Sequence, residues 1–189
     1  MGRALAKIFT HYQEEMAGAI KFVFQPAEEG MGGAFAMIAD GVLQNPRPDV
    51  ALAMHLWTPE EFGKVRVVEG PCMASSSVFT LTVQGHGGHG AAPHLAVDPI
   101  LAAAQIVSGL QSIVSRNVNP QDSVVVSIGQ FSAGTTFNVI PDRAILKGTV
   151  RSYNNDLHRM IYRRILEMAH HQAIAFSCEA TMETIAIVA

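Results

Sequence analysis

Apolar and polar positions follow one pattern in the first third of the chain. Residues 19–24 and 49–54 are short apolar runs, typical of strands that are buried on both faces of a parallel sheet. Residues 64–68 predict another short strand. Residues 4–13 and 32–39 carry apolar side chains at helical spacing. Helices that alternate with such strands predict a partial α/β domain with parallel strands. The catalytic and ligand-binding residues of such a sheet lie beyond the carboxyl ends of its strands.

A different pattern begins after the turn residues 69–71 and predicts a second domain. Its elements have the order βαββαβ, which is a ferredoxin-like fold with two helices on one antiparallel sheet. We predict strands over 78–83, 123–131, 144–152 and 175–184, and helices over 99–115 and 155–172. The outer edge of this sheet is a natural place for a second copy to pair. The predicted boundaries are 1–72, 73–184, and 185–189 for the return to the first domain.

Charge and composition exclude several classes of partner. The net charge is −3 and no basic run occurs, which argues against nucleic acid or an anionic membrane surface. No stretch approaches the roughly 20 apolar residues of a membrane span, and no signal-peptide pattern is visible. We therefore expect a cytoplasmic protein. Cys72 and Cys178 are far apart without CxxC spacing, so we expect free thiols in a reducing compartment.

Two adjacent carboxylates, Glu28 and Glu29, follow the first apolar run and a proline-containing turn. Neighbouring residues in extended backbone point in different directions. One carboxylate could bind a metal while the other faces the metal's water as a general base. The same pair is also typical of a solvated acidic turn.

His55 ends the next apolar run and is followed by Leu56 and Trp57. Imidazole is the commonest neutral metal ligand, although a single histidine at a strand end is often a hydrogen-bonded structural residue. If both runs are parallel strands, His55 and Glu29 emerge at the same sheet edge. Two ligands do not complete a site, because a catalytic zinc typically needs three protein ligands.

A glycine-rich segment, Gly85-His-Gly-Gly-His-Gly-Ala-Ala-Pro-His94, lies between a strand and a helix of the second domain. Glycine permits close approaches that a side chain would forbid, which suits a functional loop. A flexible polar loop or a loose histidine-rich metal tract is the alternative. The next helix has a start signal in Asp98 and Pro99.

Four segments together resemble the aminoacylase and carboxypeptidase family of co-catalytic metallopeptidases, in particular its amidohydrolase branch with hippurate hydrolase and auxin-conjugate hydrolases. The resemblance covers essentially the whole chain. The segments are Phe22-Val-Phe-Gln-Pro-Ala-Glu-Glu-Gly30, Met54-His-Leu-Trp57, the glycine-rich segment, and Phe137-Asn-Val-Ile-Pro-Asp142 with Gly148-Thr-Val-Arg151.

This resemblance implies roles for individual residues. Glu28 matches the general base, and Glu29 and His55 match metal ligands of a site with two divalent ions, either zinc, manganese or cobalt. His89 matches a lid histidine that stabilises the oxyanion in the partner subunit's active site. Asn138 and Arg151 match lid residues that hold the substrate's carbonyl oxygen or carboxylate. An N-acyl amino acid or short peptide substrate and a homodimer through the lid are implied as well.

Two parts of the family pattern are not found in this sequence. A Cys-Gly-His-Asp-Gly-His-type segment would precede Met1, and a further ligand histidine would follow residue 189. We therefore expect an incomplete amidohydrolase that is inactive alone. The alternative hypothesis is a non-catalytic dimerisation or ligand-binding module derived from such an enzyme.

Overall fold

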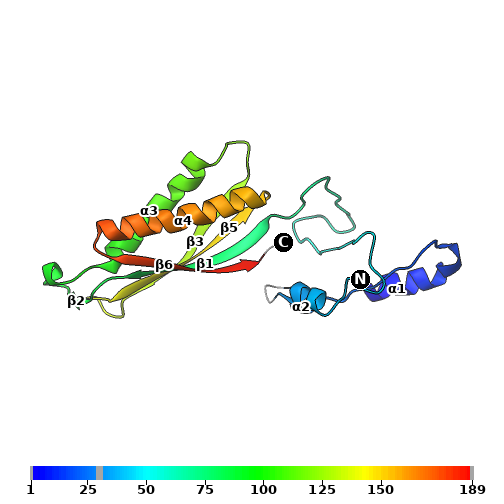
Figure 1. The fold of residues 1–189 in the computed structure, drawn as a ribbon, viewed down its shortest axis with the longest axis horizontal. Helices are drawn as coiled ribbons and strands as arrows, with labels where there is room; N and C mark the ends of the chain where they lie inside the picture. The colour runs from blue at the N-terminus through cyan, green and yellow to red at the C-terminus, as the bar shows by residue number, and fades with distance from the viewer. Residues whose placement is uncertain (1, 29–31, 188–189) are drawn as a thin grey trace. The chain divides into compact units, whose positions relative to one another are not determined.

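The chain forms two compact units, Met1–Arg66 and Val67–Ala189, in a computed structural model that describes residues 2–28 and 32–187 (Figure 1). Each unit is described by itself. Among the residues that the structure describes, none of the helices has the length and apolar composition that a membrane crossing requires.

The first unit contains the helices that the sequence predicts, α1 (Gly2–His11) and α2 (Gly33–Ala39). A short 3₁₀ helix, η1 (Gln13–Glu15), follows α1 and was not predicted. The prediction of parallel strands in this unit is wrong, because residues 19–24, 49–54 and 64–68 lie outside any strand. A strand forms when a neighbouring backbone pairs with it, and no described residue of this unit pairs with these runs. Leu52, for example, is 94% exposed.

The second unit has the predicted βαββαβ order, which confirms the mixed α/β class and the ferredoxin-like arrangement. Its sheet has the strand order β3-β5-β1-β6, with every neighbouring pair antiparallel. Both helices lie on one face of this sheet (Figure 1). The elements are β1 (Ser75–Gln84), α3 (Pro99–Asn117), β3 (Val124–Ala133), β5 (Arg143–Ser152), α4 (Asn155–Ala175) and β6 (Glu179–Ile187).

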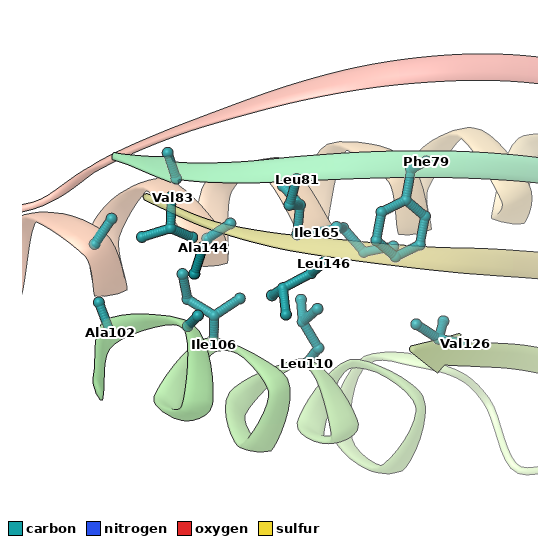
Figure 2. Packing of buried hydrophobic residues seen from close by; sticks show 14 of the residues in the cluster. Phe79, Leu81, Val83, Ala102, Ile106, Leu110, Val126, Ala144, Leu146 and Ile165 are labelled. Carbon is teal, nitrogen blue, oxygen red and sulfur yellow. The ribbon is translucent and has the colours of Figure 1, made fainter. Parts of the chain in front are cut away.

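The core of the second unit lies between the sheet and its two helices. Along β1, buried positions alternate with less buried ones, so Phe79 and Leu81 both point toward the helices. They meet Ile106 and Leu110 of α3 and Ile165 of α4, all fully buried (Figure 2). Burial of one such side chain stabilises the fold by roughly 1.5–3 kcal/mol. The alternation predicted from the sequence therefore places the polar face of β1 away from the helices.

Side-chain caps fix where the two long helices begin. Asp98 Oδ1 accepts hydrogen bonds from the backbone amides of Ile100 at 2.8 Å and Leu101 at 3.4 Å. Asn154 does the same for the first amides of α4. Because the first amides of a helix have no partner within it, each cap contributes about 1 kcal/mol. The predicted start of α3 at Asp98 and Pro99 is confirmed.

Both cysteines are free thiols, as predicted. Cys72 is exposed, whereas Cys178 is buried beside the start of α3. Burial raises the pKa of the Cys178 thiol, and the negative charge of Asp98 raises it further. The buried thiol is therefore held in its protonated, unreactive form.

Gly148 on β5 makes room for the Phe79 ring. A Cβ at this position would overlap the Phe79 ring and would lie 2.6 Å from the Ser127 carbonyl oxygen on β3. A Cβ at Gly129 on β3 would have no such neighbour within 4 Å. Both glycines lie in strands, so replacing either by alanine has a similar effect on the backbone. The two replacements differ in the packing that they disturb.

We expect Gly148→Ala to destabilise the second unit by about 1–3 kcal/mol, because backbone and ring must both move. Gly129→Ala should change the free energy of unfolding little. Urea unfolding followed by circular dichroism measures both. Equal stabilities of the two variants would contradict this account of the core.

His158, near the start of α4, is held by two serines of β1. Its Nδ1 lies 3.0 Å from Ser75 Oγ, and its Nε2 lies 2.8 Å from Ser77 Oγ. Ser75 donates its own hydrogen to the Ser152 carbonyl, so it accepts from Nδ1–H. Ser77 then donates to Nε2, because a neutral imidazole has one donor and one acceptor. Protonation of Nε2 would remove this acceptor.

The surroundings of His158 also oppose protonation. Burial lowers the pKa of His158 below the usual value of 6.5, and the positive charge of Arg151 lowers it further. The unfolded chain therefore binds a proton at higher pH than the folded chain does. This difference has no effect at pH values where His158 is neutral in both the folded and the unfolded chain. The free energy of unfolding decreases as the pH falls below the pKa of His158 in the unfolded chain.

We expect the free energy of unfolding to fall as the pH drops below about 6.5, and His158→Gln to remove part of this slope. Urea unfolding across that pH range measures the effect. His170→Gln is the matched control, because His170 is exposed on the same helix and should leave the slope unchanged. Identical slopes for wild type and His158→Gln would exclude the proposed linkage.

Candidate functional site

Glu28 lies in a tight turn of the first unit. The preceding residue, Ala27, has a left-handed backbone with φ of 51°, which costs a non-glycine residue roughly 1–2 kcal/mol. Gly33, the buried first residue of α2, approaches the Pro26 carbonyl so closely that a Cβ there would overlap it. The start of α2 therefore supports the turn from which the Glu28 carboxylate projects.

His55 presents one ring nitrogen outward. Its Nδ1 lies 2.6 Å from the Leu56 carbonyl oxygen, and a carbonyl can only accept, so Nδ1 carries the proton. In the neutral ring this leaves a lone pair on Nε2. Metal-binding histidines are held in the same way, with the second nitrogen donating to a carbonyl or carboxylate. The Trp57 ring packs edge-on against the His55 ring, with 6.4 Å between the two ring centroids.

Glu28 and His55 lie close together, although 27 positions separate them in the sequence. Glu28 Oε1 is 3.9 Å from His55 Nε2, and both side chains are more than half exposed. This distance is too long for a direct hydrogen bond and leaves room for an ion or a water between the two atoms. The lone pair on His55 suits a ligand to zinc, manganese or cobalt, and the Glu28 carboxylate lies beside it, where a general base would stand.

The described residues alone do not complete a metal site. No group of three histidine, cysteine, aspartate or glutamate side chains capable of holding a metal occurs among residues 2–28 and 32–187. The predicted ligand Glu29 lies outside the described residues. His55 is therefore oriented as a metal ligand with the Glu28 carboxylate beside it, and a complete metal site requires further ligands.

In the second unit, the glycine-rich segment forms a compact structure around His89. It contains β2 (Gly88–His89) and the short helix η2 (Pro93–Leu95). β2 pairs with β4 (Val139–Ile140), with His89 opposite Val139. His86 also exchanges backbone hydrogen bonds with Val97 at 2.9 and 2.8 Å. The segment is thus an ordered loop, and the exposed His89 side chain projects from it.

Asn138 lies directly beside this loop. Its carbonyl oxygen accepts from the Gly90 amide at 2.8 Å, and its Oδ1 accepts from Thr136 Oγ1 at 3.1 Å. A Cβ at Gly90 would lie 3.1 Å from the Asn138 oxygen, so glycine allows the close approach. The structure therefore brings together two of the predicted substrate-binding residues, His89 and Asn138.

Arg151 lies at the opposite end of the sheet from these two residues. β5 begins at Arg143, next to the glycine-rich loop, and Arg151 is near its other end. Ten residues of strand span roughly 30 Å at about 3.3 Å per residue. Within one copy of the second unit, Arg151 is therefore too far away to hold the same small substrate as His89.

A shallow groove of about 630 Å³ lies at the His89 end of the sheet. Its lining includes Gln84, Thr135 and Arg143, and none of the predicted site residues is part of it. The groove borders the His89 loop, because its lining includes Asp142, which accepts a hydrogen bond from the Gly87 amide.

Three groups hold the candidate residues and were not predicted from the sequence. They are the Leu56 carbonyl behind His55, the Ala91 amide beside His89 at 3.1 Å, and the Asp142 carboxylate at 2.9 Å from the Gly87 amide. Two of these are backbone groups that every residue carries, so no residue type could reveal them. Asp142 had a signal, because it ends one of the four characteristic segments.

Comparison with known proteins places these features in a family. The peptidase dimerisation domain family (M20_dimer) matches residues 75–175. The chain is 45% identical over 157 residues to the N-acyl-L-amino acid amidohydrolase of Geobacillus stearothermophilus, covering 82% of the chain and 42% of that protein. It is 46% identical over 151 residues to the hippurate hydrolase of Campylobacter jejuni, covering 80% of the chain and 39% of that protein.

A solved structure gives the same result. A dinuclear metal-binding peptidase of the M20 family from Bacillus subtilis matches 97% of the chain and 45% of its own length, with a TM-score of 0.75 and 32% identity. The chain thus spans less than half the length of each of these proteins. On the strength of these matches, the chain belongs to the M20 peptidase family and carries its dimerisation domain.

Proposed function

We propose that this chain forms part of the metal site and the lid of a metal-dependent amidohydrolase that cleaves N-acyl amino acids or short peptides. The observation that carries the proposal is the approach of Glu28 Oε1 to His55 Nε2 at 3.9 Å, with the opposite ring nitrogen of His55 bound to a carbonyl. The names of the amidohydrolase relatives support the same reaction class.

Each residue has a distinct task in this proposal. His55 and Glu29 hold a divalent ion, either zinc, manganese or cobalt, as part of a two-ion site. When bound, such ions supply a Lewis acid and lower the pKa of a coordinated water. Glu28 is open to solvent and accepts a proton at its carboxylate, as a general base must. Asn138 and His89 donate to the substrate's carbonyl oxygen, and Arg151 pairs with its carboxylate.

A chimera tests the reaction. The matching segment of the Geobacillus amidohydrolase is replaced by this chain, and release of free amino acid from N-acetyl and N-benzoyl substrates is measured. We expect activity with zinc, manganese or cobalt. Glu28→Gln should lower kcat by about 10²-fold or more without changing the metal content, whereas the exposed control Glu61→Gln should have no effect.

The isolated chain provides the second arm of this test. We expect it to hydrolyse none of the same substrates, because Glu29 and His55 alone cannot hold two ions. A chimera that folds and binds metal but cleaves no N-acyl substrate would refute the proposed function. Turnover by the isolated chain, abolished by Glu28→Gln, would refute the expectation that it is inactive alone.

The positions of His89 and Arg151 support a homodimer in which two copies share each site. Within one copy, a strand length of roughly 30 Å separates them, which exceeds the size of an N-acyl amino acid. If one copy supplies His89 and Asn138 while the other supplies Arg151, a single substrate can contact all three. The dimerisation family to which residues 75–175 belong supports the same assembly.

Complementation between two defective chimeras tests this arrangement. We expect His89→Ala and Arg151→Ala each to be inactive alone, and their co-expression to restore about a quarter of the wild-type activity. Half of the dimers are then mixed, and each mixed dimer has one intact site of two. Light scattering checks that both variants remain dimeric. Dimeric variants that show no rescue would mean that one copy supplies both residues.

A further inference from the structure

A hydrogen bond within its own loop selects one tautomer of the neutral His89 ring. The backbone amide of Ala91 donates to His89 Nδ1 at 3.1 Å. A backbone amide can only donate, so Nδ1 must carry the lone pair. In the neutral imidazole the proton therefore resides on Nε2. The exposed ring thus presents an N–H donor at its far end.

This tautomer is the one that the proposed role of His89 requires. A carbonyl oxygen that gains negative charge needs a donor, and a neutral imidazole can donate from only one nitrogen. With the proton on Nδ1, the outward nitrogen would carry a lone pair and repel the oxygen. The Ala91 amide excludes that form as long as the loop keeps its shape.

Asp142 holds the loop in that shape from two directions. Its Oδ1 accepts from the Gly87 amide at 2.9 Å. Its carbonyl oxygen accepts from the Gly85 amide at 2.8 Å and from Gln84 Nε2 at 2.9 Å. The carboxylate bond is charge-assisted and stronger than a neutral one. Asp142 therefore fixes the loop two residues before His89.

Glycine makes this contact possible. A Cβ at Gly87 would lie 2.8 Å from the Ile140 oxygen and 3.0 Å from Asp142 Oδ1. On the other side of His89, the Gly90 amide is bound to the Asn138 oxygen at 2.8 Å. The backbone is thus tied down both before and after the histidine, and the Ala91 amide that locks the ring follows directly.

We propose that Asp142 is a positioning residue that, through the Gly87 amide, holds the glycine-rich loop so that His89 presents a protonated Nε2 to the substrate's carbonyl oxygen. The identity of the acceptor rests on the proposed function. The tautomer and its dependence on Asp142 rest on the hydrogen bonds of the second unit alone.

Nitrogen NMR on the 189-residue chain tests the tautomer without any substrate. Long-range ¹⁵N–¹H spectra, recorded at a pH where His89 is neutral, distinguish a protonated ring nitrogen from an unprotonated one. We expect Nδ1 of His89 to be unprotonated and Nε2 to be protonated. A neutral His89 with the proton on Nδ1, or an even mixture of both forms, would overturn the inference.

Variants of Asp142 test whether this residue positions His89. Asp142→Ala should shift His89 toward a tautomer mixture and speed hydrogen exchange of the Gly87 amide, whereas Asp142→Asn keeps an acceptor and should retain most of the wild-type behaviour. The control Asp122→Ala removes an exposed loop carboxylate elsewhere in the same unit. A folded Asp142→Ala chain with an unchanged His89 spectrum and unchanged exchange would show that Asp142 does not position the ring.

The chimera adds a catalytic readout. Asp142→Ala should lower kcat about tenfold or more with little change in KM, because a misaligned donor weakens the transition state more than substrate binding, and Asp142→Asn should recover most of the loss. An unchanged kcat in Asp142→Ala would overturn the catalytic part. A locked tautomer in an inactive chimera would instead refute the proposed function and leave the positioning of His89 supported.

Discussion

The antiparallel register of β1 against β5 is the constraint on which the His89 region depends. This register places Gln84 opposite Arg143, so the chain leaves β1 at the point where it enters β5. The Gly85 amide therefore meets the Asp142 carbonyl, and the glycine-rich loop and the β4 segment emerge side by side. The buried faces of both strands hold this register, because a slip of one residue would turn Phe79, Leu81 and Leu146 away from the helices. Core packing thus determines where His89 and Asn138 meet.

The same strands that bring His89 and Asn138 together keep Arg151 away. A strand is a rigid spacer, and residues at its two ends cannot reach one small ligand. This separation could be inferred from the sequence, because the strand predicted over 144–152 lies between Asn138 and Arg151. In the homodimer that we propose, a second copy would bring its own loop to the end of the sheet that carries Arg151. Dimerisation would then be part of the chemistry as well as of stability.

Local patterns were enough to predict the second unit, whereas the first unit shows where they fail. The alternation in β1 and the Asp98 cap depend on neighbours in the sequence, and both are confirmed. The runs 19–24 and 49–54 have strand composition, but pairing requires a backbone partner that no local pattern supplies. For the candidate site, the sequence predicted that Glu29 and His55 emerge at one edge of a parallel sheet. The described residues form no such sheet and Glu29 lies outside them, but the structure places the neighbouring Glu28 3.9 Å from His55. Their catalytic roles, and that of Glu29, stay predictions.

The groups that orient the candidate residues are harder to predict than the residues themselves. His55 and His89 both have one nitrogen fixed by the backbone, but with opposite results. A carbonyl at His55 leaves Nε2 with a lone pair, which suits a cation. An amide at His89 leaves Nε2 with a proton, which suits an anion. Residue type is the same in both places, so the sequence alone cannot distinguish them. The backbone group next to each ring decides which histidine can bind a metal and which can stabilise an oxyanion.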